Sequence, residues 1–188
     1  MKDLVICVVS WNVREDLKRC LCSVISADPK LDYEIIVVDN GSKDGSPEMV
    51  MKEFSSVRLI RNRENTGFAA ACNQAVESSR STYILLLNPD TEIRADALEG
   101  MVRFMDRHPE AGGAGCRLLN PDGSLQPSVR GFPDYKSSLG QFTILGKLGF
   151  FRRARNRYLN SKFDYGRPAA VEQPMGAFLF LRRSALEE

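Results

Sequence analysis

The sequence has few of the residues on which several common kinds of protein depend. It contains a single histidine, His108, which excludes mechanisms that need two imidazole side chains. It has no apolar run that approaches the roughly 20 residues of a transmembrane helix. Its opening residues pass directly into a strand-like stretch and offer no signal-peptide cleavage site. We therefore expect neither a membrane span nor a cleaved leader.

Cysteine and excess charge are also scarce. The five cysteines are scattered and odd in number, unlike the disulfide framework of a small secreted domain. The one close pair, Cys20 and Cys22, has the wrong spacing for a zinc ribbon or a thioredoxin-like site. A reducing, cytoplasmic location is therefore expected. The 26 basic and 24 acidic residues give a net charge of +2, which argues against nucleic-acid binding by bulk charge.

The composition is that of a folded domain. The 188 residues are 43% hydrophobic and 27% charged, and this length suffices for one well-packed domain. Four short runs are almost entirely apolar, as expected of strands covered on both faces: Leu4–Ser10, Tyr33–Asp39, Val57–Arg61 and Tyr83–Leu87. Segments with helical spacing or helix-start signals follow them: Arg14–Ser26, Ser46 to about Phe54, Thr66–Ser79 and Ala95–Arg107. This alternation predicts an α/β fold with a mostly parallel sheet flanked by helices.

The second half of the chain has a different pattern. Gly112–Leu119 is predicted to be a strand, and after a tight turn Ser124–Arg130 returns as the second strand of a hairpin. Phe132–Asp164 is expected to be irregular and mobile. Ala177–Leu181 is predicted to be a last strand, followed by a helix that begins at Ser184.

The expected ligand site lies where the four apolar strands end. In open parallel sheets, ligands bind beyond the carboxyl ends of the strands. In this sequence those ends are polar and rich in Asn or Asp: Ser10-Trp11-Asn12, Asp39-Asn40-Gly41-Ser42, Asn62-Arg63-Glu64-Asn65 and Asn88-Pro89-Asp90.

Each of these segments has a structural alternative. Asp90 has the chemistry to hold a divalent cation, although Asn-Pro-Asp is also a common turn. Asp39 has the chemistry to accept a hydrogen bond from a base or a ribose, although it precedes a loop in which Asp44 and Ser46 are expected to cap a helix. Gly67, at a helix start, allows either a ligand or a neighbouring element to approach closely. Their order along one sheet edge predicts a nucleoside diphosphate site.

Two other nucleotide sites lack their sequence signatures. No G-x-G-x-x-G follows the first strand, and no G-x-x-x-x-G-K-[ST] occurs anywhere. The Rossmann dinucleotide and P-loop triphosphate readings therefore lose their main support. A receiver domain is excluded because no acidic pair follows the first strand.

The combined motifs resemble family 2 glycosyltransferases of the GT-A fold. The similar segments are Val8–Asn12, Val37–Ser42, Asn65–Asn73 and Leu87–Thr91. Arg117–Gln126, Arg130–Pro133 and Gly176–Arg183 are similar to the rhamnosyltransferase-like branch. The resemblance implies a single GT-A domain, with a Rossmann-like nucleotide-sugar-binding half over residues 1–110 and a smaller, partial acceptor-side half over residues 111–188.

The resemblance also implies roles for individual residues. It places the nucleotide-sugar donor against Ser10, Trp11, Asn12, Asp39, Gly67, Asn73, Asn88 and Asp90. Asp90 is the implied ligand of Mg²⁺ or Mn²⁺, and Asn88 replaces the first carboxylate of the family's D-x-D motif. Met175 and Gly176 fall on the acceptor side.

The activity implied is sugar transfer, with inversion, in cell-surface polysaccharide synthesis. The donor would be a UDP- or dTDP-sugar, with rhamnose one candidate sugar, and the acceptor a glycan or a lipid-linked molecule. The family's catalytic base follows a segment that ends here at Glu188, so we expect a truncated domain whose base lies further on. Peripheral association with the inner face of the membrane stays open. So do two alternatives: a nucleotide-sugar-binding module without turnover, and a nucleotidyltransferase.

Overall fold

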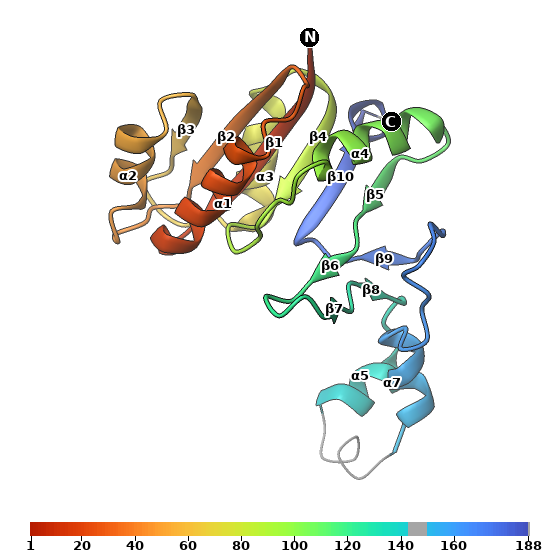
Figure 1. Ribbon diagram of the computed structural model, residues 1–188. Coiled ribbons are helices and arrows are strands. Elements are labelled where there is room, and N and C mark those ends of the chain that lie inside the picture. The colour runs from red at the N-terminus through yellow and green to blue at the C-terminus, as the bar shows by residue number, and fades with distance from the viewer. Residues whose placement is uncertain (143–149, 188) are drawn as a thin grey trace. The chain divides into compact units, whose positions relative to one another are not determined.

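The computed structural model describes residues 1–142 and 150–187, and the chain forms two compact units (Figure 1). The first unit contains Met1–Ala114 and the residues from Gly176 onward, and the second contains Gly115–Met175. The chain enters the second unit after Ala114 and leaves it at Gly176, because its last strand returns to the sheet of the first unit. The division into a donor-binding and an acceptor-side half stays a prediction.

The first unit is built on a six-stranded sheet with the order β3-β2-β1-β4-β10-β5. Its strands are β1 (Lys2–Ser10), β2 (Tyr33–Asp39), β3 (Val57–Arg61), β4 (Ser81–Leu87), β5 (Gly113–Gly115) and β10 (Phe178–Arg182). The strands β1 to β4 pair in parallel, and β10 pairs antiparallel with β4. The predicted mostly parallel α/β sheet is therefore confirmed.

Four helices connect or follow the parallel strands: α1 (Arg14–Ser26), α2 (Ser46–Glu53), α3 (Phe68–Glu77) and α4 (Ala97–Arg107). The bounds predicted for α1 are confirmed at both ends. The prediction made α3 and α4 start two residues too early. The fourth helix ends before His108-Pro109, as expected, because a residue that precedes proline avoids the helical conformation.

Both faces of the sheet are buried, which explains why the strand sequences are almost entirely apolar. On one face, Val5, Cys7 and Val9 of β1 pack in a cluster with Ala71 and Cys72 of α3. The alternate residues of β1 are also buried, because successive side chains of a strand point to opposite faces. Figure 1 shows α1 in front of β1 and β2 and α3 behind them. The sheet is thus a fixed frame whose carboxyl edge carries the polar segments.

The prediction of a single strand over Gly112–Leu119 is wrong, because two short strands of different sheets lie there. The first, β5, joins the six-stranded sheet, whereas β6 (Leu118–Leu119) forms a hairpin with β7 (Leu125–Gln126). The glycines of β5 allow close packing, since a Cβ at Gly113 would lie 2.9 Å from the Leu181 side chain.

The predicted return strand also divides. Its last residues form β8 (Val129–Arg130), which pairs with β9 (Gln173–Pro174) instead of continuing the hairpin. The second unit thus contains two separate two-stranded sheets within the residues that the structure describes.

The prediction that Phe132–Asp164 is irregular is also wrong for its described part. It contains α5 (Tyr135–Phe142) and α7 (Arg152–Tyr158), while residues 143–149 lie outside the described residues. Asp134 starts α5 by a reciprocal contact: its carboxylate accepts from Ser137 N–H, and its own N–H donates to Ser137 Oγ. The helix predicted from Ser184 is a short 3-10 helix, Arg183–Leu186.

In residues 1–142 and 150–187, no helix combines the length and the apolar character of a membrane span.

Candidate functional site

The strand register brings polar residues from different parts of the chain to one edge of the sheet. Ser10, the last residue of β1, pairs with Asp39, the last residue of β2. Asp39 pairs in turn with Arg61, the last residue of β3. On the other side of β1, Val8 pairs with Leu87, so Asn88 and the residues after it continue from the same edge.

Ser10 and Asp39 have buried polar atoms without partners. Ser10 is fully buried and Asp39 is 2% exposed. Asp39 Oδ1 accepts hydrogen bonds from the backbone N–H groups of Gly41 (3.2 Å) and Ser42 (2.9 Å). Among the described residues, Asp39 Oδ2 and Ser10 Oγ have no hydrogen-bond partner. A buried polar group left unpaired costs about 1–3 kcal/mol, so this pair has the chemistry of a site completed by a ligand.

The loop after β2 is held in one conformation. Gly41 has a φ of +79°, and a Cβ there would lie 3.0 Å from Glu64 Cα, so a side chain does not fit. Asn12 bonds to the loop twice, because its N–H donates to Ser42 Oγ at 3.0 Å and its Oδ1 accepts from Lys43 N–H at 2.8 Å. Asn12 therefore positions the loop. Its place in the donor pocket, which the family resemblance implies, stays a prediction.

Asp44 is the second anchor of the same loop. The expectation that Ser46 caps the helix is wrong, because the N-cap of α2 is Gly45 and Ser46 is the first helical residue. Asp44 instead binds that first residue from outside the helix. Its Oδ1 accepts hydrogen bonds from the N–H and the hydroxyl of Ser46, and its Oδ2 accepts from Arg14 N–H at 2.9 Å. Burial by itself would raise the pKa of Asp44, but these hydrogen bonds to the charged form outweigh burial and lower the pKa.

A network of side-chain amides joins β2 and β3 to α3. The buried Asn40 donates to the carbonyl of Gly67 at 3.2 Å and accepts from Asn62 at 2.9 Å and from Thr66 Oγ1 at 3.1 Å. Asn62 and Gln74 bond to each other in both directions, at 2.9 and 3.2 Å. The start of α3 is thereby fixed against the ends of two strands.

A cavity of about 320 Å³ opens at this edge. It is lined by Asp39, Gly41, Ser42, Lys43, Arg61, Asn62 and Arg63. Among the residues predicted for the donor site, Asp39 alone is in the lining. The Lys43, Arg61 and Arg63 side chains were not singled out as site residues. Arg63 belongs to the strand end Asn62–Asn65 at which the site was expected, and Arg61 is the last residue of β3, one position before it.

The other predicted donor residues lie around this edge with more exposure. Trp11, directly after β1, is 54% exposed. Gly67 has a φ of +87° and immediately precedes α3, whose residue Asn73 is exposed.

The turn after β4 carries the predicted metal ligand. Asn88 N–H donates to the carbonyl of Ala177 at 3.0 Å, which fixes the turn against the start of β10. Asp90 is exposed, and its carboxylate makes no hydrogen bond or ion pair with any described residue. Burial, together with the smaller effect of the negative charges of Asp90 and Glu92, raises the pKa of the nearby Cys20 thiol to about 12.

These residues fit a divalent cation that a ligand completes. Among the described residues, no three Asp, Glu, His or Cys side chains gather to form a metal site by themselves. Mg²⁺, however, often takes only one or two protein carboxylates and otherwise binds phosphate oxygens and water. The free carboxylate of Asp90 fits such a site.

The predicted acceptor residues lie at the boundary of the two units. Met175 N–H donates to the carbonyl of Ser128 at 2.8 Å within the second unit, and Gly176 is the first residue of the return to the first unit.

Comparisons with known proteins agree with this fold. The profile of Glycosyl transferase family 2 matches residues 5–185. The chain is 26% identical over 197 residues to the N-acetylglucosaminyl-diphospho-decaprenol L-rhamnosyltransferase of Mycobacterium tuberculosis (strain ATCC 25618 / H37Rv). The match covers 97% of this chain but 62% of that relative, so the chain spans less than two thirds of its length.

Two solved glycosyltransferase structures have a similar fold. The mannosyltransferase PcManGT from Pyrobaculum calidifontis, in complex with GDP-Man and Mn²⁺, has a TM-score of 0.57 and 23% identity over 64% of this chain and 36% of its own. TarS from S. aureus, in complex with UDP-GlcNAc, has a TM-score of 0.57 and 20% identity over 70% of this chain and 37% of its own. The matched profile covers nearly all of the sequence, and the chain therefore belongs to glycosyl transferase family 2.

Proposed function

We propose that this chain binds the nucleotide-sugar donor of a glycosyltransferase that acts in cell-surface polysaccharide synthesis. The observation that carries the proposal is the pair of buried, unpaired oxygens, Ser10 Oγ and Asp39 Oδ2, on adjacent strand ends. A nucleoside offers the N–H and hydroxyl donors that these oxygens lack. Asp39 also lines a cavity of about 320 Å³, a volume within the range of small-molecule sites.

In this proposal the nucleoside lies against the ends of β1 and β2. Asp39 Oδ2 accepts a hydrogen bond from the base or the ribose, and Ser10 Oγ takes a second bond. Trp11 borders the site with an aromatic side chain that is half exposed before the ligand binds. Asn12 acts indirectly, because it holds the loop that contains Ser42.

The diphosphate and sugar extend toward the start of α3 and the turn after β4. Gly67 and Asn73 border the donor there, and Asn88 and Asp90 lie on the side of β4. Asp90 has the chemistry to hold Mg²⁺ or Mn²⁺, a role supported by its free carboxylate and by the Mn²⁺ in the similar PcManGT structure. A divalent cation there would neutralise the charge that develops on the departing diphosphate.

The substrates are proposed by analogy with the relatives. A UDP- or dTDP-sugar is the proposed donor, and the TarS complex contains UDP-GlcNAc. A glycan or a lipid-linked molecule is the proposed acceptor, since the mycobacterial relative is named for a diphospho-decaprenol substrate and for rhamnosyl transfer. Met175 and Gly176 are proposed to border the acceptor.

The proposed reaction inverts the anomeric centre. A carboxylate takes the proton of the acceptor hydroxyl as that oxygen attacks the anomeric carbon and the nucleoside diphosphate departs. We assign no residue of this chain as that base, and its location after Glu188 stays a prediction. The two units together form the proposed single GT-A domain, at the inner face of the membrane where a lipid-linked acceptor would lie.

A calorimetric titration tests the donor site directly. UDP, dTDP and GDP are each titrated into the chain with and without Mn²⁺, and binding of at least one at micromolar concentration is expected. No binding by any of the three would refute the proposal. Transfer from the matching radiolabelled sugar to membrane lipid extract then separates an enzyme from a binding module without turnover.

A further inference from the structure

The two units differ sharply in charge. Residues 115–175 contain ten basic and four acidic residues, a net charge of +6. The rest of the chain contains 16 basic and 20 acidic residues, a net charge of −4. The small net charge of the whole chain therefore hides a strongly basic second unit. Such an asymmetry is typical of proteins in which one part contacts an anionic partner.

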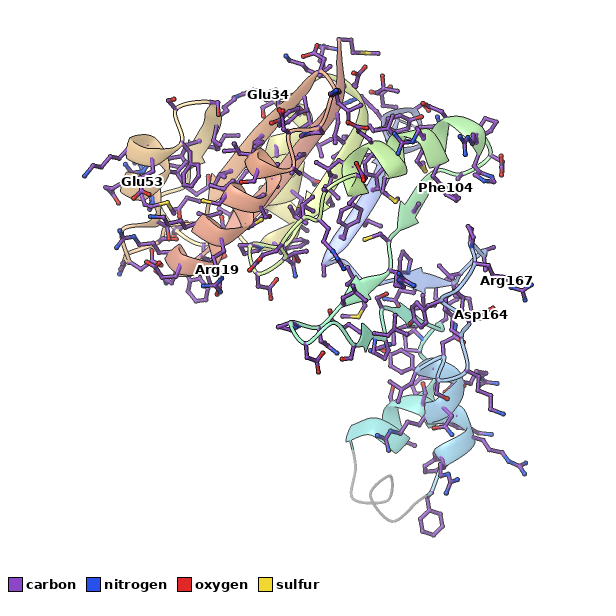
Figure 2. All side chains as sticks on the ribbon, in the orientation of Figure 1. Arg19, Glu34, Glu53, Phe104, Asp164 and Arg167 are labelled. Carbon is purple, nitrogen blue, oxygen red and sulfur yellow. The ribbon has the colours of Figure 1, made fainter. Side chains whose placement is uncertain are left out.

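The positive charge of the second unit concentrates on α7. Four of its seven residues are arginines, and all four are exposed. Arg157 forms an ion pair with Asp134, but Arg152, Arg153 and Arg155 pair with no described residue. Figure 2 shows Arg167 beside Asp164, its ion-pair partner at 3.4 Å, so this nearby arginine is neutralised. Among the described residues of α5, α7 and the segment after α7 up to Arg167, the basic side chains without an ion-pair partner are thus the three α7 arginines, Lys136 and Lys162.

Large aromatic side chains are exposed in the same part of the unit. Phe150, which precedes α7, is 59% exposed. Phe132 and Tyr135, at the start of α5, are 70% and 92% exposed. Exposed apolar side chains that gather in one part of a unit are typical of a surface that contacts a partner.

The aromatic and basic residues belong to one compact pair of helices. α5 packs against α7, and Gly131 N–H donates to the carbonyl of Tyr158 at 2.8 Å. The ion pair between Arg157 and Asp134 joins the end of α7 to the start of α5. Phe132 and Tyr135 therefore lie near one end of α7, and Phe150 lies near its other end.

We propose that this helix pair docks on the surface of an anionic lipid bilayer. Unpaired arginines attract acidic headgroups, and aromatic side chains insert at the boundary between headgroups and acyl chains. Exposed aromatic side chains also stack on single-stranded bases, but nucleic-acid-binding proteins usually carry a clear basic excess, and this chain has a net charge of only +2. An anionic bilayer matches the local arginines and the aromatic side chains without that excess. The proposal deepens the proposed function, because it places the chain where a lipid-linked acceptor would lie.

Vesicle sedimentation tests the surface. The whole chain is mixed with vesicles of phosphatidylcholine alone or with 30% phosphatidylglycerol, at low and at physiological salt. Binding to the anionic vesicles is expected, and it should weaken with salt. The triple variant Arg152→Gln/Arg153→Gln/Arg155→Gln should bind about 100-fold more weakly at low salt, since each basic residue near an anionic leaflet contributes about a factor of five.

A matched variant separates a local surface from net charge. Arg80→Gln/Arg94→Gln/Arg107→Gln removes three exposed arginines of the first unit that pair with no described side chain. It should keep the vesicle affinity of the parent chain. Phe150→Ser should weaken vesicle binding at physiological salt, because salt screens the attraction between charges but not the insertion of an apolar side chain.

The proposal is overturned if both triple variants lose vesicle affinity equally, or if vesicles of phosphatidylcholine alone bind the chain as tightly as the anionic vesicles do. It is also overturned if single-stranded RNA, at the same total phosphate charge, releases the chain from the vesicles. Nucleotide titration of each variant runs in parallel. A chain that binds vesicles but no nucleotide supports the docking surface and refutes the proposed function. A chain that binds nucleotide but no vesicles supports the proposed function and refutes the docking surface.

Discussion

The substitution Asp39→Asn tests the proposed donor site most directly. Asparagine has the same shape as aspartate, and its Oδ1 can still accept from the N–H groups of Gly41 and Ser42, so the loop is kept. The change replaces the unpaired Oδ2 with an NH₂ group. An acceptor that faces the ligand thus becomes a donor.

The structure gives opposite expectations for affinity and for stability. A hydrogen bond to a charged group contributes about 1.5–3 kcal/mol, so nucleotide affinity should fall by roughly tenfold to a hundredfold. Without ligand, the free energy of unfolding should change by less than about 1 kcal/mol, because the weaker loop bonds are offset by the removal of a buried charge.

Calorimetry with the nucleoside diphosphate that binds the parent chain measures the first quantity, and urea unfolding measures the second. Asp44→Asn is the matched control, since Asp44 belongs to the same loop but does not line the cavity. It should lower stability, because Nδ2 cannot accept from Arg14 N–H, and leave affinity within a factor of about three. If Asp39→Asn binds nucleotide as tightly as the parent, the unpaired oxygen does not face a ligand and the site is wrong.

Three further predictions follow from the same edge of the sheet. Gly41→Ala should lower the free energy of unfolding by about 1–2 kcal/mol or more, because alanine is strained at a φ of +79° and its Cβ would meet backbone; an unchanged urea midpoint would contradict this. Asp90→Ala should abolish the gain in nucleotide affinity that Mn²⁺ gives the parent chain and leave the affinity without metal unchanged. If Mn²⁺ still strengthens nucleotide binding by the variant, Asp90 is not the metal ligand. The folded state lowers the pKa of Asp44, so its stabilising contribution is present above the ordinary value near 3.8 and is lost as the pH falls through the lowered value; the difference in thermal midpoint between the parent and Asp44→Asn should therefore be largest near pH 7 and shrink at pH 3.

The sheet and its helices could be predicted from the sequence because their signals are local. The central parallel strands are buried on both faces, so their sequences are largely apolar runs, and the predicted bounds of β2 and of the edge strand β3 are confirmed. The hydrophobic spacing of α1 depends on one face of one helix, and its predicted bounds are also confirmed. Prediction failed where a segment contributes to two units, as in Gly112–Leu119, or where short polar helices such as α7 lack an apolar stripe.

The candidate site was predicted in position but not in detail. The strand ends named the edge at which the cavity opens, since parallel strands bring their carboxyl ends together. The sequence could not separate Asp39, which lines the cavity, from Asn12, which holds a loop, because both are polar residues that follow a strand. The sequence also could not show that Arg61 and Lys43 line the cavity, because nothing in the sequence separates them from the other polar residues near the strand ends.

The sequence by itself determined the alternation of the four parallel strands with their helices and the edge at which polar residues gather, because periodicity and apolar runs report burial residue by residue. Only the tertiary structure decided which polar atoms lack partners. Whether Ser10 Oγ and Asp39 Oδ2 are satisfied depends on the register between β1 and β2 and on the conformation of the loop after β2, and both are set by contacts between residues about 30 positions apart.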